Sequence, residues 1–176
     1  MKELKSLEEA YEVSAVRLVS KRQRAKVGDI FRLSPSKGIF LWGRLIKRAK
    51  FFGLTSDFNL VYIYDAMSET RPSIDVLSPK KLIIGPSVVN NLGWTRGYWE
   101  IVASVPITPA EMLDHHFFIH YHGTGSRSDY DIVDEQGQIV RGAKVQIDKL
   151  AQSGFGNFNL IDWQIRTILR ERGVIV

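Results

Sequence analysis

Apolar residues fall into short runs bounded by turn-forming residues along much of the chain. Two runs rich in β-branched and aromatic residues, Lys26–Leu33 and Ile39–Ile46, are separated by the turn-forming stretch Ser34–Gly38. This pattern predicts an antiparallel strand pair that opens a curled sheet. Phe58–Asp65 predicts a third strand, and because its apolar residues do not alternate with polar ones, we expect both of its faces to be covered.

The middle of the chain predicts shorter elements. Ser78–Pro86 is a brief apolar run punctuated by Pro and Gly, which fits a loop or a short strand. Asp134–Gly137 predicts a tight turn, after which Gln138–Arg141 returns antiparallel to Tyr130–Val133 as the clearest hairpin. One helical turn is indicated where Thr108 precedes Pro109–Met112. Further strands are expected over Gly97–Pro106, His116–Tyr121 and Asp129–Val133.

Helical periodicity is confined to the two ends. Over Glu3–Ser20, apolar residues recur every three or four positions, which predicts an amphipathic helix that packs on the sheet. It leads into Lys21–Lys26, whose cations either complement a helix C-terminus or contact a phosphate or an acidic partner. A final helix is predicted over Leu160–Arg172, with Asn159 as its N-cap and Gly173 at its end. Its buried stripe comprises Ile161, Ile165, Ile168 and Leu169.

These elements predict an α+β fold. We expect a strongly curved, mainly antiparallel β-sheet or partial barrel, flanked by an N-terminal and a C-terminal helix. The 176 residues fit one domain over 1–176, with the N-terminal helix in 1–24, a β-rich core in 26–150 and the C-terminal helix in 159–172.

Composition narrows the class of protein further. The net charge of +5 permits nucleic acid, an anionic membrane surface or an acidic protein as partner without choosing among them. Cysteine is absent, which excludes disulfides and thiolate catalysis and fits a reducing compartment. No apolar run approaches the roughly 20 residues of a membrane span, and no signal-peptide pattern is present, so we expect a cytoplasmic protein that does not insert into membranes.

All four histidines lie within His115–His122. On a strand, His116, His120 and His122 would share one face and could bind a metal ion. A zinc site needs three or four placed ligands with supporting partners, and the sequence offers no outlying carboxylate, so a strand with a histidine-rich polar face is the preferred interpretation.

An acidic cluster follows the histidines. Asp129, Asp131, Asp134 and Glu135 could serve acid-base chemistry or bind Mg²⁺, but acidic residues are also common in turns for conformational reasons, and we favour that explanation. The nearby Gly123–Ser126 lacks the ending of a phosphate-binding loop. We therefore predict no catalytic residue, no metal site and no cofactor.

Aromatic and basic residues interleave at two places. Trp42 precedes Arg44 within an apolar strand, and Trp94 precedes Arg96 in a glycine-flanked stretch. Trp and Arg are enriched at interface hot spots, and aromatic residues also stack on bases in single-stranded nucleic-acid sites. We expect Trp42 and Trp99 to pack in the core and Trp94 to be exposed. Trp94 and Arg96 are the leading candidate partner contacts, with Trp42 and Arg44 as weaker ones.

The order of several strand motifs resembles that of the Immunity protein 26 family. The motifs are Lys26–Leu33, Phe40 with Gly43–Leu45, Val61–Asp65 and Gly97–Val102 followed by Pro106–Ile107, and the similarity extends from Lys26 to about Leu169. The resemblance implies a bacterial α+β protein without enzymatic activity, which binds and neutralises a cognate polymorphic toxin. Residues up to Arg24 lie outside the match, and the matching motifs form the fold, so they carry over no toxin contact.

Two functional hypotheses remain. The first is an immunity protein that occludes its toxin non-covalently; the positive net charge argues against mimicry of nucleic acid and suits an acidic toxin surface. The alternative is a basic nucleic-acid-binding β-barrel, since Gly28–Phe31 also resembles ribonuclease toxins of toxin-antitoxin modules. A hydrolase built on the histidines is a remote third option, because no nucleophile or full ligand set accompanies them.

Overall fold

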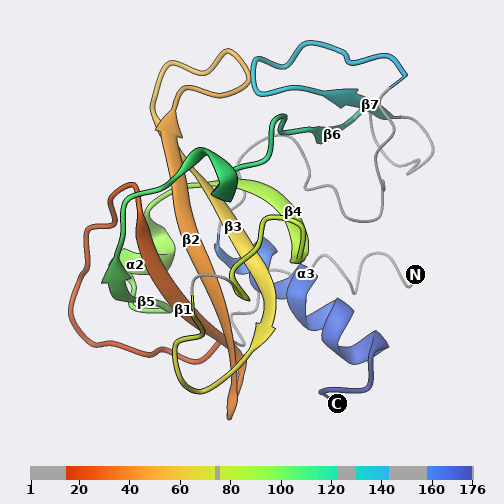
Figure 1. Cartoon of the computed structure of the whole chain (residues 1–176). Coiled ribbons are helices and arrows are strands. Elements are labelled where there is room, and N and C mark those ends of the chain that lie inside the picture. Colours follow the sequence, from red (N-terminus) through yellow and green to blue (C-terminus); the bar gives the residue numbers. More distant parts are fainter. Residues whose placement is uncertain (1–14, 74–75, 123–129, 143–157, 176) are drawn as a thin grey trace.

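A five-stranded antiparallel sheet forms the centre of the protein. The computed structural model describes residues 15–73, 76–122, 130–142 and 158–175. The strands follow the order β4-β3-β2-β1-β5, and the sheet is open, because its edges β4 and β5 do not pair with each other (Figure 1). The strands are β1 (Asp29–Ser36), β2 (Ile39–Ala49), β3 (Phe58–Met67), β4 (Leu82–Val89) and β5 (Trp99–Ser104). The mainly antiparallel sheet is confirmed, and the strong curvature or partial barrel stays a prediction.

The predicted first strand pair is confirmed in position and direction. β1 and β2 are antiparallel, with Ile30 opposite Arg44 and Leu33 opposite Leu41. Of the two alternatives for Ser78–Pro86, a loop or a short strand, the structure shows a strand from Leu82 onward. This strand, β4, pairs with β3 and places Val88 opposite Leu60.

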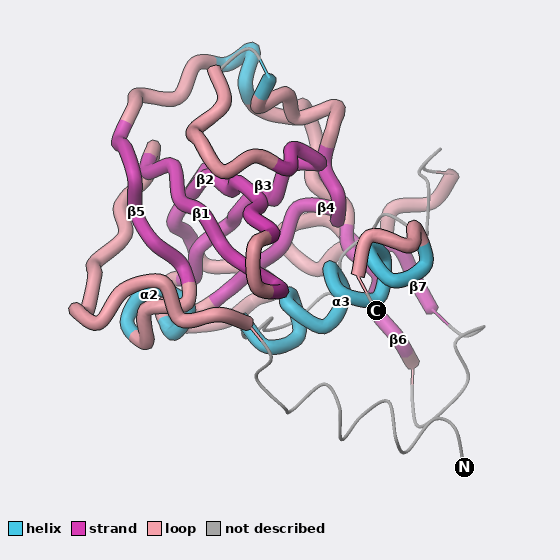
Figure 2. Tube along the Cα trace, turned by 90° about the horizontal axis from the view of Figure 1, so that it is seen from below, coloured by secondary structure: helices cyan, strands magenta, loops and turns pink. Residues whose placement is uncertain are grey.

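Both faces of the sheet are covered, as predicted for the third strand. Successive side chains of a strand point to opposite faces, so Val61 and Ile63 enter one core while Tyr62 and Tyr64 enter the other. The first core is completed by α2 (Leu92–Thr95) and α3 (Phe158–Glu171), which lie on the same side of the sheet in Figure 2. The second core includes Phe118 and Val133 from a separate two-stranded sheet, β6 (Phe118–Tyr121) and β7 (Tyr130–Val133).

Residues 15–24 are not helical, which corrects the expected N-terminal helix where the structure describes it. Residues 1–14 lie outside the described residues. The backbone N–H groups of Leu18 and Val19 donate to the carbonyl oxygen of Gly97 at 2.8 and 3.1 Å, and that of Val16 donates to Ser34 at 2.8 Å. Tertiary hydrogen bonds therefore replace the helical ones, and Lys21–Lys26 complements no helix end.

The C-terminal helix is confirmed. In α3, Ile161, Ile165 and Leu169 are buried and Ile168 is partly buried against the same core. Asn159 lies inside the helix rather than at its cap. None of the helices in the described ranges is long and apolar enough to cross a membrane.

The hairpin after β7 is shorter than predicted. The turn Asp134–Gly137 forms, with the Gly137 N–H donating to the Asp134 carbonyl at 3.0 Å, but only Val133 and Ile139 form a bridge across it. β7 pairs with β6 instead, with His120 opposite Asp131. The single helical turn after Thr108 is confirmed as the 3₁₀ helix η2 (Pro109–Glu111).

Candidate partner-binding site

Trp42 and Arg44 are buried in the second core and do not reach the surface. The Trp42 indole N–H donates to the Ser68 carbonyl at 3.0 Å. The Arg44 guanidinium is fully buried and donates to Glu111 Oε1 at 2.5 Å and to the carbonyl oxygens of Val105 and Pro106, each at 2.9 Å. η2 and the segment before it thus cover this side of β2 and bind both terminal nitrogens of Arg44. Both residues hold the fold together in this conformation, and the burial expected for Trp42 is confirmed.

Trp94 is also buried, which corrects its predicted exposure. Its side chain is 0% exposed and meets the rings of Phe31 and Trp99 edge-on, at centroid distances of 5.2 and 4.8 Å. Trp99, as expected, is in the core and stacks on Phe31 at 4.8 Å. The glycines that flank Trp94 do not mark an exposed loop, because Gly93 lies in α2 and its missing side chain leaves room for the Trp99 ring. Of the four candidate contacts, only Arg96 is exposed.

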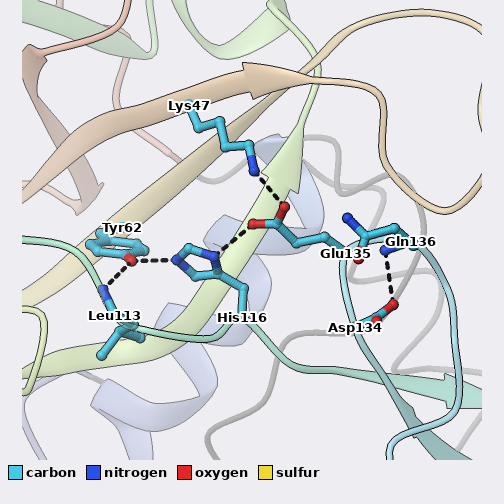
Figure 3. Close-up of polar contacts among 7 residues, drawn as sticks. All are labelled: Lys47, Tyr62, Leu113, His116, Asp134, Glu135 and Gln136. Atoms are coloured by element: carbon cyan, nitrogen blue, oxygen red, sulfur yellow. Dashed lines mark hydrogen bonds and ion pairs between the residues drawn. The ribbon is translucent and has the colours of Figure 1, made fainter. Parts of the chain in front are cut away.

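A chain of polar side chains links the two sheets, and the sequence pattern did not predict it. Lys47 on β2 donates to Glu135 Oε2 at 2.5 Å, and Glu135 Oε1 lies 2.7 Å from His116 Nδ1 (Figure 3). His116 Nε2 lies 2.5 Å from the hydroxyl of Tyr62 on β3. That hydroxyl accepts the Leu113 N–H at 3.0 Å. The contacts join residues 88 positions apart, from Lys47 to Glu135, so local periodicity carries no signal for them.

The proton positions along this chain follow from its acceptors. Glu135 accepts from both neighbours, so His116 carries its proton on Nδ1 and leaves Nε2 to accept the Tyr62 hydroxyl proton. Burial lowers the pKa of His116, and the Glu135 carboxylate only partly offsets this effect. Burial raises the pKa of Tyr62 to about 12, so the phenol stays protonated near neutral pH.

The arrangement superficially resembles a nucleophile, base and carboxylate in line. Tyr62 is 0% exposed, however, and its oxygen is already bonded to both His116 and Leu113. A substrate would have to displace packed side chains to reach that oxygen. The geometry therefore serves to fasten the turn after β7 and the segment before β6 onto the five-stranded sheet.

His116 lies before β6 and so does not share a strand with His120, which corrects the strand expected over His116–Tyr121. His116 points to Tyr62, whereas the rings of His120 and His122 lie 5.4 Å apart and His122 bonds to Asp131 at 2.7 Å. In the residues that the structure describes, no group of three or more His, Asp or Glu side chains could hold a metal ion.

The acidic residues after β7 have separate roles. Asp134 Oδ1 accepts the backbone N–H groups of Gln136 and Gln138, each at 2.9 Å, which confirms its conformational role in the turn. Glu135 instead belongs to the polar chain. Asp129 and Gly123–Ser126 lie outside the described residues.

The fold and the site define an α+β protein in which the side chains of Trp42, Trp94, Arg44 and Tyr62 are buried in the core. Residues 26–129 match the model of the Immunity protein 26 family, a stretch of more than half of the chain, and the chain belongs to this family. Membership confirms the resemblance seen in the strand motifs and implies a toxin as partner. No curated protein and no solved structure matches the chain.

Proposed function

We propose that this protein is an immunity protein of a bacterial polymorphic toxin system, which neutralises its cognate toxin inside the cell by non-covalent occlusion. The family match over residues 26–129 carries the proposal. It is supported by the site, because the buried Tyr62 and Arg44 already have partners within the fold and are poorly placed for chemistry on a bound molecule. Binding through the surface needs neither a cofactor nor a catalytic group.

The burial of three candidate contacts changes the expected interface. Arg96 remains a proposed contact because its side chain is exposed at the end of α2. Trp42, Arg44 and Trp94 would influence binding only by holding the fold, because an occluding partner cannot touch a side chain that is at most 1% exposed.

Capture followed by a growth assay tests the proposal. Tagged full-length protein is recovered from cells of its source, with nuclease and high-salt washes, and each protein retained is then expressed alone. We expect one retained protein to arrest growth and co-expression of the full chain to restore it.

The control separates neutralisation from an effect on expression. A strain that co-expresses the toxin with an unrelated protein carrying the same tag should stay arrested. The toxin level in this strain should equal that in the strain that co-expresses the full chain. If no retained protein is toxic, or if the chain fails to relieve the toxicity, the proposed function is wrong.

A further inference from the structure

One stretch of the described surface carries a dense group of positively charged side chains. We call it the basic band, and its six exposed cations are Arg17, Lys21, Arg22, Arg24, Lys26 and Arg96. From Ala15 to Gly28 the chain contains no acidic residue. In the described part of the chain none of the six forms an ion pair, whereas Arg32, Arg44, Lys47, Arg166 and Arg172 each have a carboxylate partner.

Hydrogen bonds gather this segment against α2 and β5. Leu18 and Val19 are bonded to Gly97, the neighbour of Arg96, and Gln23 Oε1 accepts the N–H of Ile101 at 3.0 Å. Figure 1 shows the segment as the red loop that passes around the outer side of β5 before entering β1. Arg96 is therefore continuous in space with cations that are far from it in sequence.

The backbone of the band is held in place before any partner arrives. Arg48 donates from Nη2 to the Ala25 carbonyl at 3.2 Å and to Asn91 Oδ1 at 3.3 Å. Ala25 itself is buried, and the backbone N–H of Lys26 donates to the buried Asp29 at 2.9 Å. A fixed backbone keeps the cations close together despite their mutual repulsion and lowers the entropic cost of binding.

We propose that the basic band is the surface that docks an acidic face of the toxin. This inference rests on the proposed function and adds where the toxin binds and which chemistry it presents. Clustered cations facing clustered carboxylates steer encounter and fix orientation. Val27, in the segment that carries the band, is 50% exposed, and Val102 on β5 is 43% exposed. Both add apolar surface of the kind found at interface centres.

A protein partner explains this surface better than single-stranded nucleic acid does. Nonspecific single-strand sites combine positive charge with aromatic side chains on which bases stack. The aromatic residues closest to the band are engaged elsewhere, because Trp94 and Trp99 are buried and Tyr98 stacks on Phe158 at 4.6 Å.

Matched charge reversals test the inference in the full chain. Arg22→Glu with Arg24→Glu changes the band, and Lys80→Glu with Lys81→Glu makes the same change in net charge at exposed residues in the turn before β4. The probe is the toxin identified by the growth assay, and its Kd is measured at low and at physiological salt. We expect the band variant to bind about tenfold or more weakly and the control to stay within about twofold of the unmodified chain.

The outcomes separate the two proposals. Equal affinity of all three chains, each shown to be folded by its thermal unfolding, overturns the band while leaving the proposed function intact. Absence of toxin binding by the unmodified chain and by the control overturns both. Binding of duplex or single-stranded RNA that the band variant alone loses, with toxin affinity unchanged, assigns the band to nucleic acid and overturns the docking surface.

Discussion

Residue type alone did not decide which Trp and Arg side chains are exposed. Trp42, Trp94 and Arg44 have the chemistry of interface anchors, yet all three lie in the core. Arg44 can be buried because one carboxylate and two carbonyl oxygens accept hydrogen bonds from its two terminal nitrogens. The same contacts lower the pKa of Glu111. Burial alone would raise this pKa, but the hydrogen bonds that the carboxylate accepts from Thr108 and Arg44 outweigh that effect.

Removal of the carboxylate beside Arg44 should destabilise the protein strongly. Glu111→Ala leaves a buried guanidinium without its counter-charge, and the expected loss of unfolding free energy is about 3 kcal/mol. Urea denaturation measures it, with the exposed Glu69→Ala as the control, which should change stability by less than about 0.5 kcal/mol. Equal effects of the two substitutions would show that the Arg44 pair does not matter for stability.

His116 should make stability depend on pH. Because burial lowers its pKa below the ordinary 6.5, the unfolded chain binds a proton more readily than the folded one. Its contribution to stability is therefore complete above about pH 6.5 and declines as the pH falls through 6.5 toward the folded value. Unfolding free energies from pH 8 to 5 should show this decline.

The matched variant isolates the histidine from other groups. His116→Gln should be less stable at pH 8, because it disturbs the bonds to Tyr62 and Glu135, and should lose the part of the decline that His116 causes. Asp162, whose pKa burial raises to about 6, titrates in both proteins, so its contribution cancels in the difference. Parallel pH profiles of the two proteins would contradict the assignment.

At the scale of elements, tertiary contacts outweighed helical periodicity in the N-terminal segment. Residues 15–20 continue the apolar spacing of the predicted helix, but Leu18 and Val19 bond to Gly97. Gly97 adopts a φ of +81°, and a Cβ there would overlap the carbonyl oxygen of Val19. The approach of the segment to α2 therefore depends on the absence of a side chain at this position.

Gly97→Ala should detach the N-terminal segment. The variant combines left-handed backbone strain of about 1 kcal/mol with the overlap against Val19, so we expect faster hydrogen exchange at the amides of Leu18 and Val19. Gly38→Ala is the control, because Gly38 has a φ of +79° but open space around its Cβ position. Similar exchange at these amides in both variants would mean that the overlap with Val19 does not govern the contact.

At the scale of the whole molecule, charge is distributed unevenly. The net charge of +5 is modest, but the basic band gathers its six exposed cations from Arg96 and from one stretch, Ala15–Gly28, that contains no acidic residue. Such a field acts on encounter with a charged partner more than on the fold itself.

Association with the toxin should consequently slow as salt rises. Between about 50 and 300 mM salt, we expect the association rate constant of the unmodified chain to fall several-fold while the dissociation rate changes little. Stopped-flow or surface-based kinetics with the toxin measures both. Arg22→Glu with Arg24→Glu should flatten the dependence, and an unchanged salt slope in that variant would remove the band from the encounter step.

Strands β1 to β3 and β5 and the C-terminal helix could be predicted, because each follows from a local run of apolar residues and the turns that bound it. The order of the strand motifs also sufficed to indicate the family. The remaining features depend on contacts between distant segments. The burial of Trp94 and Arg44, the polar chain from Lys47 to Tyr62 and the assembly of the basic band all join residues distant in sequence. Local patterns indicate which face of an element is apolar, but they do not indicate which segment covers that face. Arg44 is buried and Arg96 is exposed because a distant segment covers only the first of them.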